Sequence, residues 1–230
     1  MIEFIWIGQA GLLIRTPALT LLCDPYLSDS VAAVEPQNRR RVPVDRSLLS
    51  LVPDVILLTH NHLDHTDPDT LCNYLTADSA VTVLAAPGAW QTARKFGGLG
   101  NNYVRLPRHA EWSVGDVRVR AVPAVHSDPE AVGFLLTHEG KNYYITGDTL
   151  YSEEIFADLP DRVEALFLPI NGVGNNLNPT DAARFAARVG ARRVVPYHVG
   201  MFDSHLPSEL CCPGVVVPQL YQKIALGEEK

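Results

Sequence analysis

Short apolar or alternating segments recur along the whole chain, separated by polar turn residues. Most are five or six residues long and are bounded by Gly, Pro, Asn or Asp, which is typical of β-strands. Segments 8–11 and 139–142 are rich in turn residues and predict hairpin connections. The predicted strands span residues 3–7, 11–15, 19–23, 55–59, 81–85, 117–122, 133–137, 142–146, 165–168 and 193–196.

Helical signals lie between these strands. Asp67, Pro68 and Asp69 provide a cap, a first-turn proline and an acidic start, and they predict a helix that runs to about residue 76. Residues 178–181 repeat this pattern and predict a helix that ends before Gly190. Further helices are predicted from about residue 87 to just before Gly97 and, more weakly, over residues 152–159. Two batches of strands with helices predict two sheets packed face to face with helices outside.

Length and composition describe an ordinary globular chain. The 230 residues are 47% apolar and 20% charged, with no linker-like segment, so we expect one domain over residues 1–230. A net charge of −7 argues against a general nucleic-acid or anionic-membrane binder, because such proteins need a positive field. No signal-peptide pattern or long apolar span is visible, and the four cysteines lack C-x-x-C spacing. These features predict a cytoplasmic protein with reduced thiols.

Three of the eight histidines fall within six residues. His60, His62 and His65, with Asp64 between them, directly follow the apolar run at 55–58. Imidazole and carboxylate are the ligands that zinc, manganese and iron share, and this spacing gathers four of them at the end of a buried strand. The alternative is a polar loop that carries surface histidines. The cluster therefore predicts a metal site.

Three more candidate ligands follow predicted strands. His126, Asp148 and His198 each come just after the end of an apolar segment, which is where the first cluster lies. Taken singly, each would more often be a turn residue, a helix cap or a hydrogen-bonded histidine. His109 and His205 could line the same cleft but match no ligand position. The three strand-end residues predict the remainder of the metal site.

In this order, H-x-H-x-D-H, a lone His, an Asp after Gly and a final His, the whole chain resembles the metallo-β-lactamase superfamily. The resemblance implies an α/β fold, a four-layer αββα sandwich of two mixed sheets. It also implies two divalent metal ions, Zn or Mn and alternatively Fe, at one edge of that sandwich. The implied ligands are His60, His62 and His126 for one ion, Asp64, His65 and His198 for the other, and Asp148 as the bridge between them.

Several further segments are similar to the superfamily branch that contains L-ascorbate-6-phosphate lactonase. They are residues 6–14, 23–30, 41–44, 170–179 and 196–202. This resemblance implies that the chain opens a lactone with manganese or zinc. The known lactonase is longer than this chain, and its extra segments help to shape the substrate pocket. The exact substrate therefore does not transfer.

Two segments are candidates for substrate contacts. The Gly/Asn-rich turn at residues 172–176, with Asn175 and Asn176, precedes a predicted helix N-terminus, where free N–H groups favour an anion. Asn171, just before this turn, is a further candidate. The alternative is that this turn simply caps the helix. In residues 39–41, Arg40 and Arg41 could contact a phosphate or carboxylate, although such a run is more often solvated surface.

These observations predict a dinuclear metal-dependent hydrolase acting on a small anionic lactone or related ester. In this hypothesis a metal-bound hydroxide would attack the carbonyl, Asp148 would bridge the ions as the resemblance implies, and Asp64 would return a proton to the leaving alkoxide. Asp24 and Asp67 are candidates to orient ligand histidines, although Asp24 could equally be a turn residue. Phosphodiester hydrolysis of a cyclic nucleotide or RNA-like substrate is the alternative reaction, and a non-catalytic metal-binding role is the alternative class. Homo-oligomerisation is compatible with the sequence.

Overall fold

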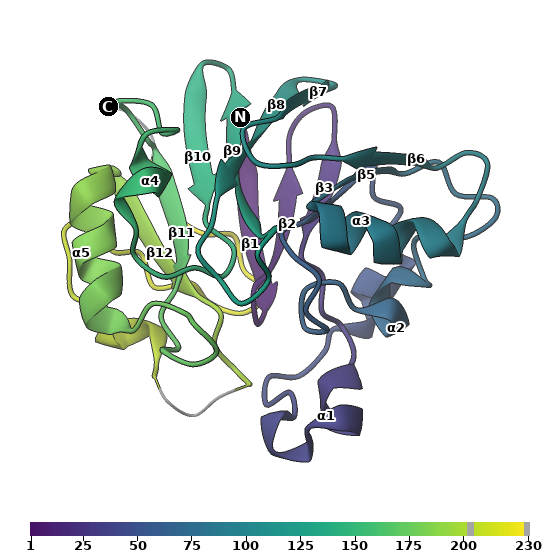
Figure 1. The fold of residues 1–230 in the computed structure, drawn as a ribbon, viewed down its shortest axis with the longest axis horizontal. Helices are drawn as coiled ribbons and strands as arrows, with labels where there is room; N and C mark the ends of the chain where they lie inside the picture. Colours follow the sequence, from purple (N-terminus) through teal and green to yellow (C-terminus); the bar gives the residue numbers. More distant parts are fainter. Residues whose placement is uncertain (202–204, 228–230) are drawn as a thin grey trace.

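The computed structural model describes residues 1–201 and 205–227 and contains two six-stranded sheets (Figure 1). The first sheet has the order β1-β2-β3-β4-β5-β6; the second has the order β12-β11-β10-β9-β8-β7. The strands of the first sheet are β1 (Glu3–Gly8), β2 (Gly11–Arg15), β3 (Thr20–Cys23), β4 (Val55–Leu58), β5 (Thr82–Ala85) and β6 (Asn102–Arg105). Those of the second are β7 (Glu111–Val114), β8 (Val117–Pro123), β9 (Val132–His138), β10 (Lys141–Ile145), β11 (Ala165–Pro169) and β12 (Arg193–Tyr197).

Both sheets are mixed in the same way. Antiparallel pairs β1-β2 and β2-β3 lead into the parallel strands β4 to β6, and antiparallel pairs from β7 to β10 lead into the parallel strands β11 and β12. The predicted turns at residues 8–11 and 139–142 connect antiparallel neighbours, as expected. Strands β1, β3 and β4 therefore run in one direction in their sheet, and β8, β10, β11 and β12 do so in theirs.

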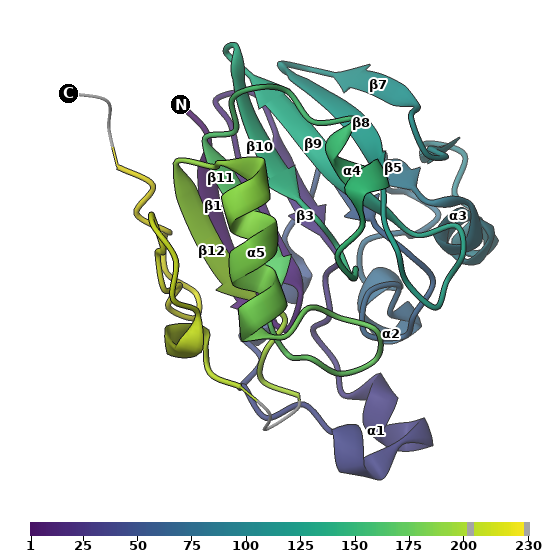
Figure 2. The ribbon, with the colours of Figure 1, turned by 60° about the vertical axis from the view of Figure 1, so that its left-hand side comes forward.

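Helices cover the outer faces of the sandwich, as Figures 1 and 2 show. Helices α2 (Pro68–Leu71) and α3 (Pro87–Ala93) pack on the first sheet, and α4 (Glu153–Phe156) and α5 (Pro179–Val189) pack on the second. Helix α1 (Ser30–Val34) projects beyond one end of the sheets. Short 3₁₀ turns lie at Pro36–Asn38, Arg46–Ser50, Arg94–Phe96 and Pro207–Glu209. The predicted αββα layers are confirmed.

The core forms where the apolar faces of the two sheets meet. Val55 and Leu57 of β4 point into this central core, whereas Ile56 and Leu58 point to the outer layer beneath α2 and α3, because side chains alternate along a strand. Across the sheet interface the rings of Phe4 and Phe167 lie 4.7 Å apart. A strand with apolar residues on both faces is buried on both sides, which explains the uninterrupted apolar run before the histidine cluster.

The C-terminal segment protects the sheet edges. The backbone N–H of Ile224 donates to Phe4 on edge strand β1, and that of Val216 donates to Val194 on edge strand β12. Edge strands otherwise expose unpaired backbone groups to other chains. Within residues 1–201 and 205–227, every helix is too short or too polar to cross a lipid bilayer.

The helix predicted to run from Asp67 to about residue 76 is shorter than expected. Regular α2 ends at Leu71, because the side-chain amide of Asn73 donates to the carbonyls of Asp69 and Thr70 and so competes with the backbone bonds of a longer helix. The segment predicted at 152–159 likewise forms one turn, α4. Strands β6 and β7 and helix α1 were not predicted, since their residues are largely exposed and lack a clear apolar pattern.

The contact between the two sheets provides a test of the fold. Replacing Phe167 with alanine should destabilise the protein by about 3–5 kcal/mol, because a fully buried ring leaves a cavity. Urea denaturation followed by circular dichroism measures this change. Trp112→Ala, on the exposed edge strand β7, is the matched control and should cost much less. Equal losses for the two variants would contradict the packing described here.

Candidate metal centre

All seven predicted ligands converge at one end of the sandwich. Four of them, His60, His62, Asp64 and His65, lie in the loop after β4. The other three, His126, Asp148 and His198, follow β8, β10 and β12. Because these strands run in the same direction within each sheet, their C-terminal ends meet at one edge. Three groups of side chains there have ligand atoms that all lie within 4.8 Å of one another. They are His60, His62 and His126; His60, His65 and Asp148; and Asp64, His65 and His198.

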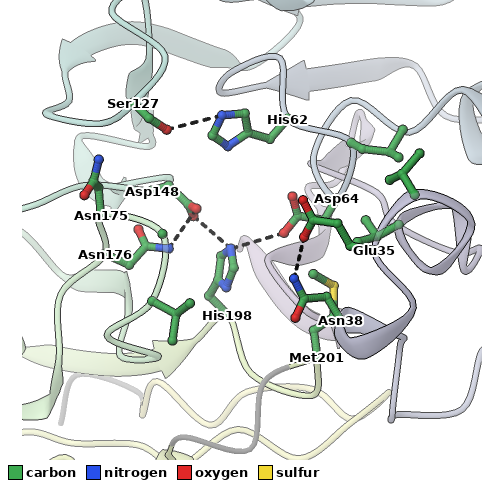
Figure 3. A pocket seen from close by; sticks show the side chains of 15 residues that line it. Glu35, Asn38, His62, Asp64, Ser127, Asp148, Asn175, Asn176, His198 and Met201 are labelled. Carbon is green, nitrogen blue, oxygen red and sulfur yellow. Dashed lines mark hydrogen bonds and ion pairs between the residues drawn. The ribbon is translucent and has the colours of Figure 1, made fainter.

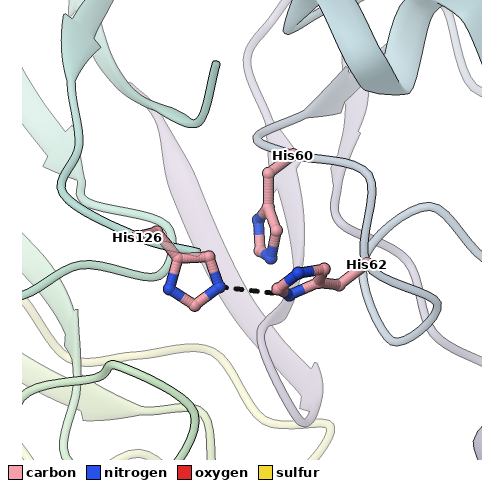
Figure 4. A group of neighbouring side chains, drawn as sticks. All are labelled: His60, His62 and His126. Carbon is pink, nitrogen blue, oxygen red and sulfur yellow. Dashed lines mark hydrogen bonds between the residues drawn. The ribbon is translucent and has the colours of Figure 1, made fainter. Parts of the chain in front are cut away.

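The first group consists of three histidines (Figure 4). Nε2 of His126 lies 3.1 Å from Nδ1 of His62, and the ring of His60 stands edge-on to both rings. Nε2 of His60 is buried and has no hydrogen-bond partner. A buried imidazole nitrogen without a partner is rare and unfavourable, so this geometry fits a cation placed between the three rings.

The second group is built around two facing imidazoles. Nε2 of His65 lies 3.0 Å from Nε2 of His198, and each of these nitrogens lies 3.6 Å from Oδ2 of Asp64. Asp148 joins this group to the first one. Its Oδ1 lies 3.0 Å from His198 and 3.3 Å from His65, whereas its Oδ2 lies 3.7 Å from Nε2 of His126. One carboxylate therefore faces both groups of ligands.

The buried Asp24 carboxylate orients histidines of both groups. Its Oδ2 accepts a hydrogen bond from Nδ1 of His65 at 2.8 Å and another from the Thr59 hydroxyl at 2.6 Å. That hydroxyl, which lies 3.0 Å from Nδ1 of His60, can then accept a hydrogen bond from it. Both imidazoles are thus left with Nε2 facing the centre, the arrangement that a carboxylate usually enforces on ligand histidines. These contacts fit the orienting role predicted for Asp24.

The other three imidazoles are held by neighbouring polar groups. Nδ1 of His126 lies 3.2 Å from the backbone carbonyl of Asn175, and Nε2 of His62 lies 3.4 Å from the Ser127 hydroxyl. Nδ1 of His198 lies 2.9 Å from the Asn171 amide and 3.3 Å from the Gln9 amide. Every imidazole in the site therefore has its second nitrogen fixed, which sets the direction of the first.

The electrostatics of the site also fit a bound cation. Burial lowers the pKa of His60 well below its ordinary value, aided by the charge of His65, so His60 is neutral and able to bind metal. Burial acts to lower the pKa of His65 as well, but the nearby carboxylates of Asp148 and Asp64 raise it well above the usual range. Protons held in this way are the ones that a metal ion displaces when it binds.

Gly147 permits the close approach of the two sheets at this edge. Its φ is +61°, and a Cβ atom placed there would lie 2.9 Å from Cβ of Thr59. A side chain would therefore collide with the loop after β4 and strain the backbone. The glycine lets Asp148 come directly beneath the histidine cluster.

A cavity of about 560 Å³ opens over the ligands (Figure 3). It is lined by four of the predicted ligands, by the turn after β11, and by residues of α1 and its surroundings. A volume of this size suits a small molecule. The lining residues are Val31, Val34, Glu35, Asn38, His62, Leu63, Asp64, Ser127, Asp148, Val173, Gly174, Asn175, Asn176, His198 and Met201.

The predicted substrate contacts divide into two sets. Asn175 and Asn176 line the cavity, but the Asn176 amide donates to Oδ2 of Asp148 at 2.8 Å, and Asn171 is turned toward His198. Arg40 and Arg41 are not brought to the cavity. The guanidinium of Arg40 instead donates to three backbone carbonyls, those of Ile7, Tyr26 and Val42.

Three other residues singled out from the sequence lie outside the ligand cluster. Asp67 caps α2 and accepts hydrogen bonds from two serine hydroxyls, so it anchors a loop rather than a histidine. His109 pairs with Asp158 at 2.7 Å, and His205 pairs with Glu209 at the same distance.

Gln9 and Thr59 were missed as functional residues. Gln9 follows β1 and is almost fully buried, and its amide donates to Oδ2 of Asp64 at 3.0 Å. Its φ of +51° is unusual for a residue other than glycine and holds the side chain over the second group. The turn composition of residues 8–11 predicted the hairpin but carried no signal for this contact.

Comparison with known proteins places the chain in a family. Residues 20–199 match the family model described as beta-lactamase superfamily domain. A UPF0173 metal-dependent hydrolase from Ligilactobacillus salivarius is 32% identical over 203 residues, which cover 86% of this chain and 84% of the relative. Another from Geobacillus thermodenitrificans is 30% identical over 212 residues, covering 85% and 84%. The chain therefore belongs to the metallo-β-lactamase superfamily and, within it, to the UPF0173 metal-dependent hydrolases.

A solved structure supports the fold. The isothiocyanate hydrolase from Delia radicum gut bacteria superimposes with a TM-score of 0.72 and covers 96% of this chain and 97% of its own, at 19% sequence identity. Similarity at this level of identity shows the fold alone. The fold and the metal-dependent hydrolase class predicted from the sequence are thus confirmed, whereas the lactonase-like branch stays a prediction.

Gln9 offers a selective test of the second ligand group. Removing its side chain with Gln9→Ala should weaken metal binding at Asp64, His65 and His198 by about 10–100-fold, since residues that orient ligands contribute on this scale. Binding at His60, His62 and His126 should be unchanged. Isothermal titration of the metal-free protein with Zn²⁺ or Mn²⁺ separates the two events, and Gln91→Ala on the exposed face of α3 is the control. Equal weakening of both events would refute the selective role of Gln9.

Proposed function

We propose that the chain is a dinuclear metal-dependent hydrolase that opens a small lactone or cleaves a related ester. One observation carries the proposal. Imidazole and carboxylate side chains from both sheets point at one another beneath an open cavity, and the buried Nε2 of His60 has no partner among them. Seven such groups and no thiolate form the ligand set of a hydrolytic site with nitrogen and oxygen ligands.

Two divalent ions held there, Zn²⁺ or Mn²⁺ with Fe²⁺ as the alternative, would supply an activated water and polarise the carbonyl oxygen. His60, His62 and His126 would hold one ion and Asp64, His65 and His198 the other, with Asp148 between them. Asn171, Asn176, Asp24 and Gln9 position these ligands through the contacts described above.

Two residues have further roles in the proposed reaction. The Asp64 carboxylate lines the cavity and is 14% exposed, so it can take the proton released by the attacking water and return it to the alkoxide leaving group. An ester or lactone needs this proton, because an alkoxide is a poor leaving group. The side chain of Asn175 also faces the cavity and can donate to a polar atom of the substrate. Their positions support lactone or ester hydrolysis.

The two alternatives rank below this reaction. A phosphodiester keeps a negative charge through the reaction, and none of the described residues that line the cavity is a lysine or arginine that could bind it. A non-catalytic metal-binding role would tolerate the loss of ligands, yet all seven are present. The first observation favours a neutral carbonyl substrate over a phosphodiester. The second favours a hydrolase over a non-catalytic metal-binding protein.

Metal content tests the proposed ligand arrangement. Purified protein loaded with Zn²⁺ or Mn²⁺ should hold about two ions per chain, and His62→Ala about one. Asp148→Asn should hold fewer than His62→Ala, because it removes a negative charge that faces both groups. Elemental analysis after desalting measures all three. Retention of two ions by Asp148→Asn would rule out its bridging position.

A substrate panel tests the reaction itself. Metal-loaded protein should hydrolyse small lactones or carboxylic esters with a higher kcat/KM than bis(p-nitrophenyl) phosphate, and chelation with EDTA should abolish the activity. Asp64→Asn, which loses the proton carrier, should reduce kcat more for alkyl esters than for p-nitrophenyl esters, whose leaving group needs little protonation. If phosphodiesters turn over while every lactone and ester stays intact, the alternative reaction is the correct one.

A further inference from the structure

The cavity over the metal ligands has an apolar wall. Val31 and Met201 are buried and pack with Tyr26 and the partly buried Leu63, and all but Tyr26 line the cavity. Val34 of α1 and Val173 of the turn after β11 also line it, although they are 68% and 38% exposed. Apolar side chains left exposed beside a site are expected where a ligand covers them. A substrate with an aliphatic substituent would do so.

The rim of this wall carries a negative charge. Glu35 directly follows α1 and lines the cavity, and its Oε2 accepts a hydrogen bond from the Asn38 amide at 2.5 Å (Figure 3). The guanidinium of Arg40 donates to three backbone carbonyls, and Arg40 is not among the residues that line the cavity. A carboxylate or phosphate on the far end of a substrate would therefore meet Glu35 without a compensating lysine or arginine among the described lining residues.

The helix N-terminus beside the cavity is also unsuited to an anion. The side chain of Asn178 caps α5 by accepting from the backbone N–H of Asp181, and Asp181 itself places a carboxylate in the first turn. That negative charge already offsets the positive end of the helix dipole. The start of α5 therefore offers little electrostatic attraction to an anionic substituent.

We propose that the cavity selects an uncharged lactone or ester whose aliphatic substituent lies against Val31, Val34 and Met201, and that Glu35 discriminates against negatively charged substituents. This inference rests on the proposed function for the position of the scissile carbonyl. It replaces the anionic substrate expected from the sequence. That expectation depended on the arginine run at residues 39–41 and on the turn at 172–176. Residues 173–176 of the turn line the cavity, but none of the three arginines does.

Binding of metal-chelating probes tests the charge preference without turnover. Hexanohydroxamic acid and adipic monohydroxamic acid share the same metal-binding end and six-carbon chain, but only the second ends in a carboxylate. Isothermal titration of the metal-loaded protein should show the neutral probe binding about fivefold to tenfold tighter at low salt, the scale of one charge pair near a surface. This ratio should fall as salt is added.

Variants separate the effect of the Glu35 charge from that of the apolar wall. Glu35→Gln should bring the ratio of the two dissociation constants close to one, and Glu35→Lys should invert it. Glu154→Lys makes the same charge change on α4, outside the cavity lining, and should leave the ratio unchanged. Val34→Ser should weaken hexanohydroxamic acid more than acetohydroxamic acid, which is too short to reach the wall.

The outcomes distinguish this inference from the proposed reaction. A carboxylate probe that binds as tightly as the neutral one, a ratio insensitive to Glu35→Lys, or failure of both probes to bind would overturn the inference. If the probes behave as expected but no lactone or ester is hydrolysed, the cavity preference stands and the proposed reaction fails. If esters turn over but the probes show no charge preference, the proposed reaction stands and the cavity preference fails.

Discussion

The carboxylate of Asp24 is the interaction on which the site depends. It is completely buried, and it accepts hydrogen bonds from the backbone and hydroxyl of Thr59 and from His65. Burying a carboxylate without hydrogen-bond donors costs a large free energy. The hydrogen bonds to Asp24 therefore hold its three donors in place. Through Thr59 it also sets the direction of His60. One charge thus connects histidines of both ligand groups before any metal is bound.

The fold makes this convergence possible because each sheet delivers its functional residues at the same ends of its strands. Gly147 lets the loops after β4 and β10 approach within contact distance, and Asp148 follows it directly. Gln9 reaches across from the first sheet to Asp64 and to His198 of the second. The ligands are therefore held by short loops on rigid strands, whereas the cavity wall around α1 lies outside the sheets and can vary without disturbing them.

Periodicity and motif spacing predicted much of this arrangement. The apolar run before His60 indicated a buried strand. The order of the ligands, through its resemblance to the metallo-β-lactamase superfamily, implied the fold and the edge where the ligands meet. Asp24 was one of two candidates to orient a ligand histidine, with a turn role as the equal alternative, and its hydrogen bond to His65 fits the first of these roles. Residues whose role depends on contacts between distant segments were not: Gln9 lies 189 positions before His198, and nothing in its local sequence marks that contact.

Charge near the site was the least predictable property. The run at residues 39–41 looked able to bind an anion, but the guanidinium of Arg40 satisfies backbone carbonyls of three different segments. Such carbonyls are visible only once the chain is folded, and an arginine with several donors is well suited to them. Conversely, residues 30–34 lack a clear helical pattern, so α1 was not predicted and neither Val34 nor Glu35 was expected at the cavity.

The most direct measurement of the central claim is the position of bound metal. Crystals of the protein prepared with Mn²⁺, examined by anomalous diffraction, should show two peaks per chain about 3.5–4 Å apart. One peak should lie among His60, His62 and His126, the other among Asp64, His65 and His198, with Asp148 contacting both. A single peak, or peaks away from these side chains, would contradict a dinuclear centre built from both sheets.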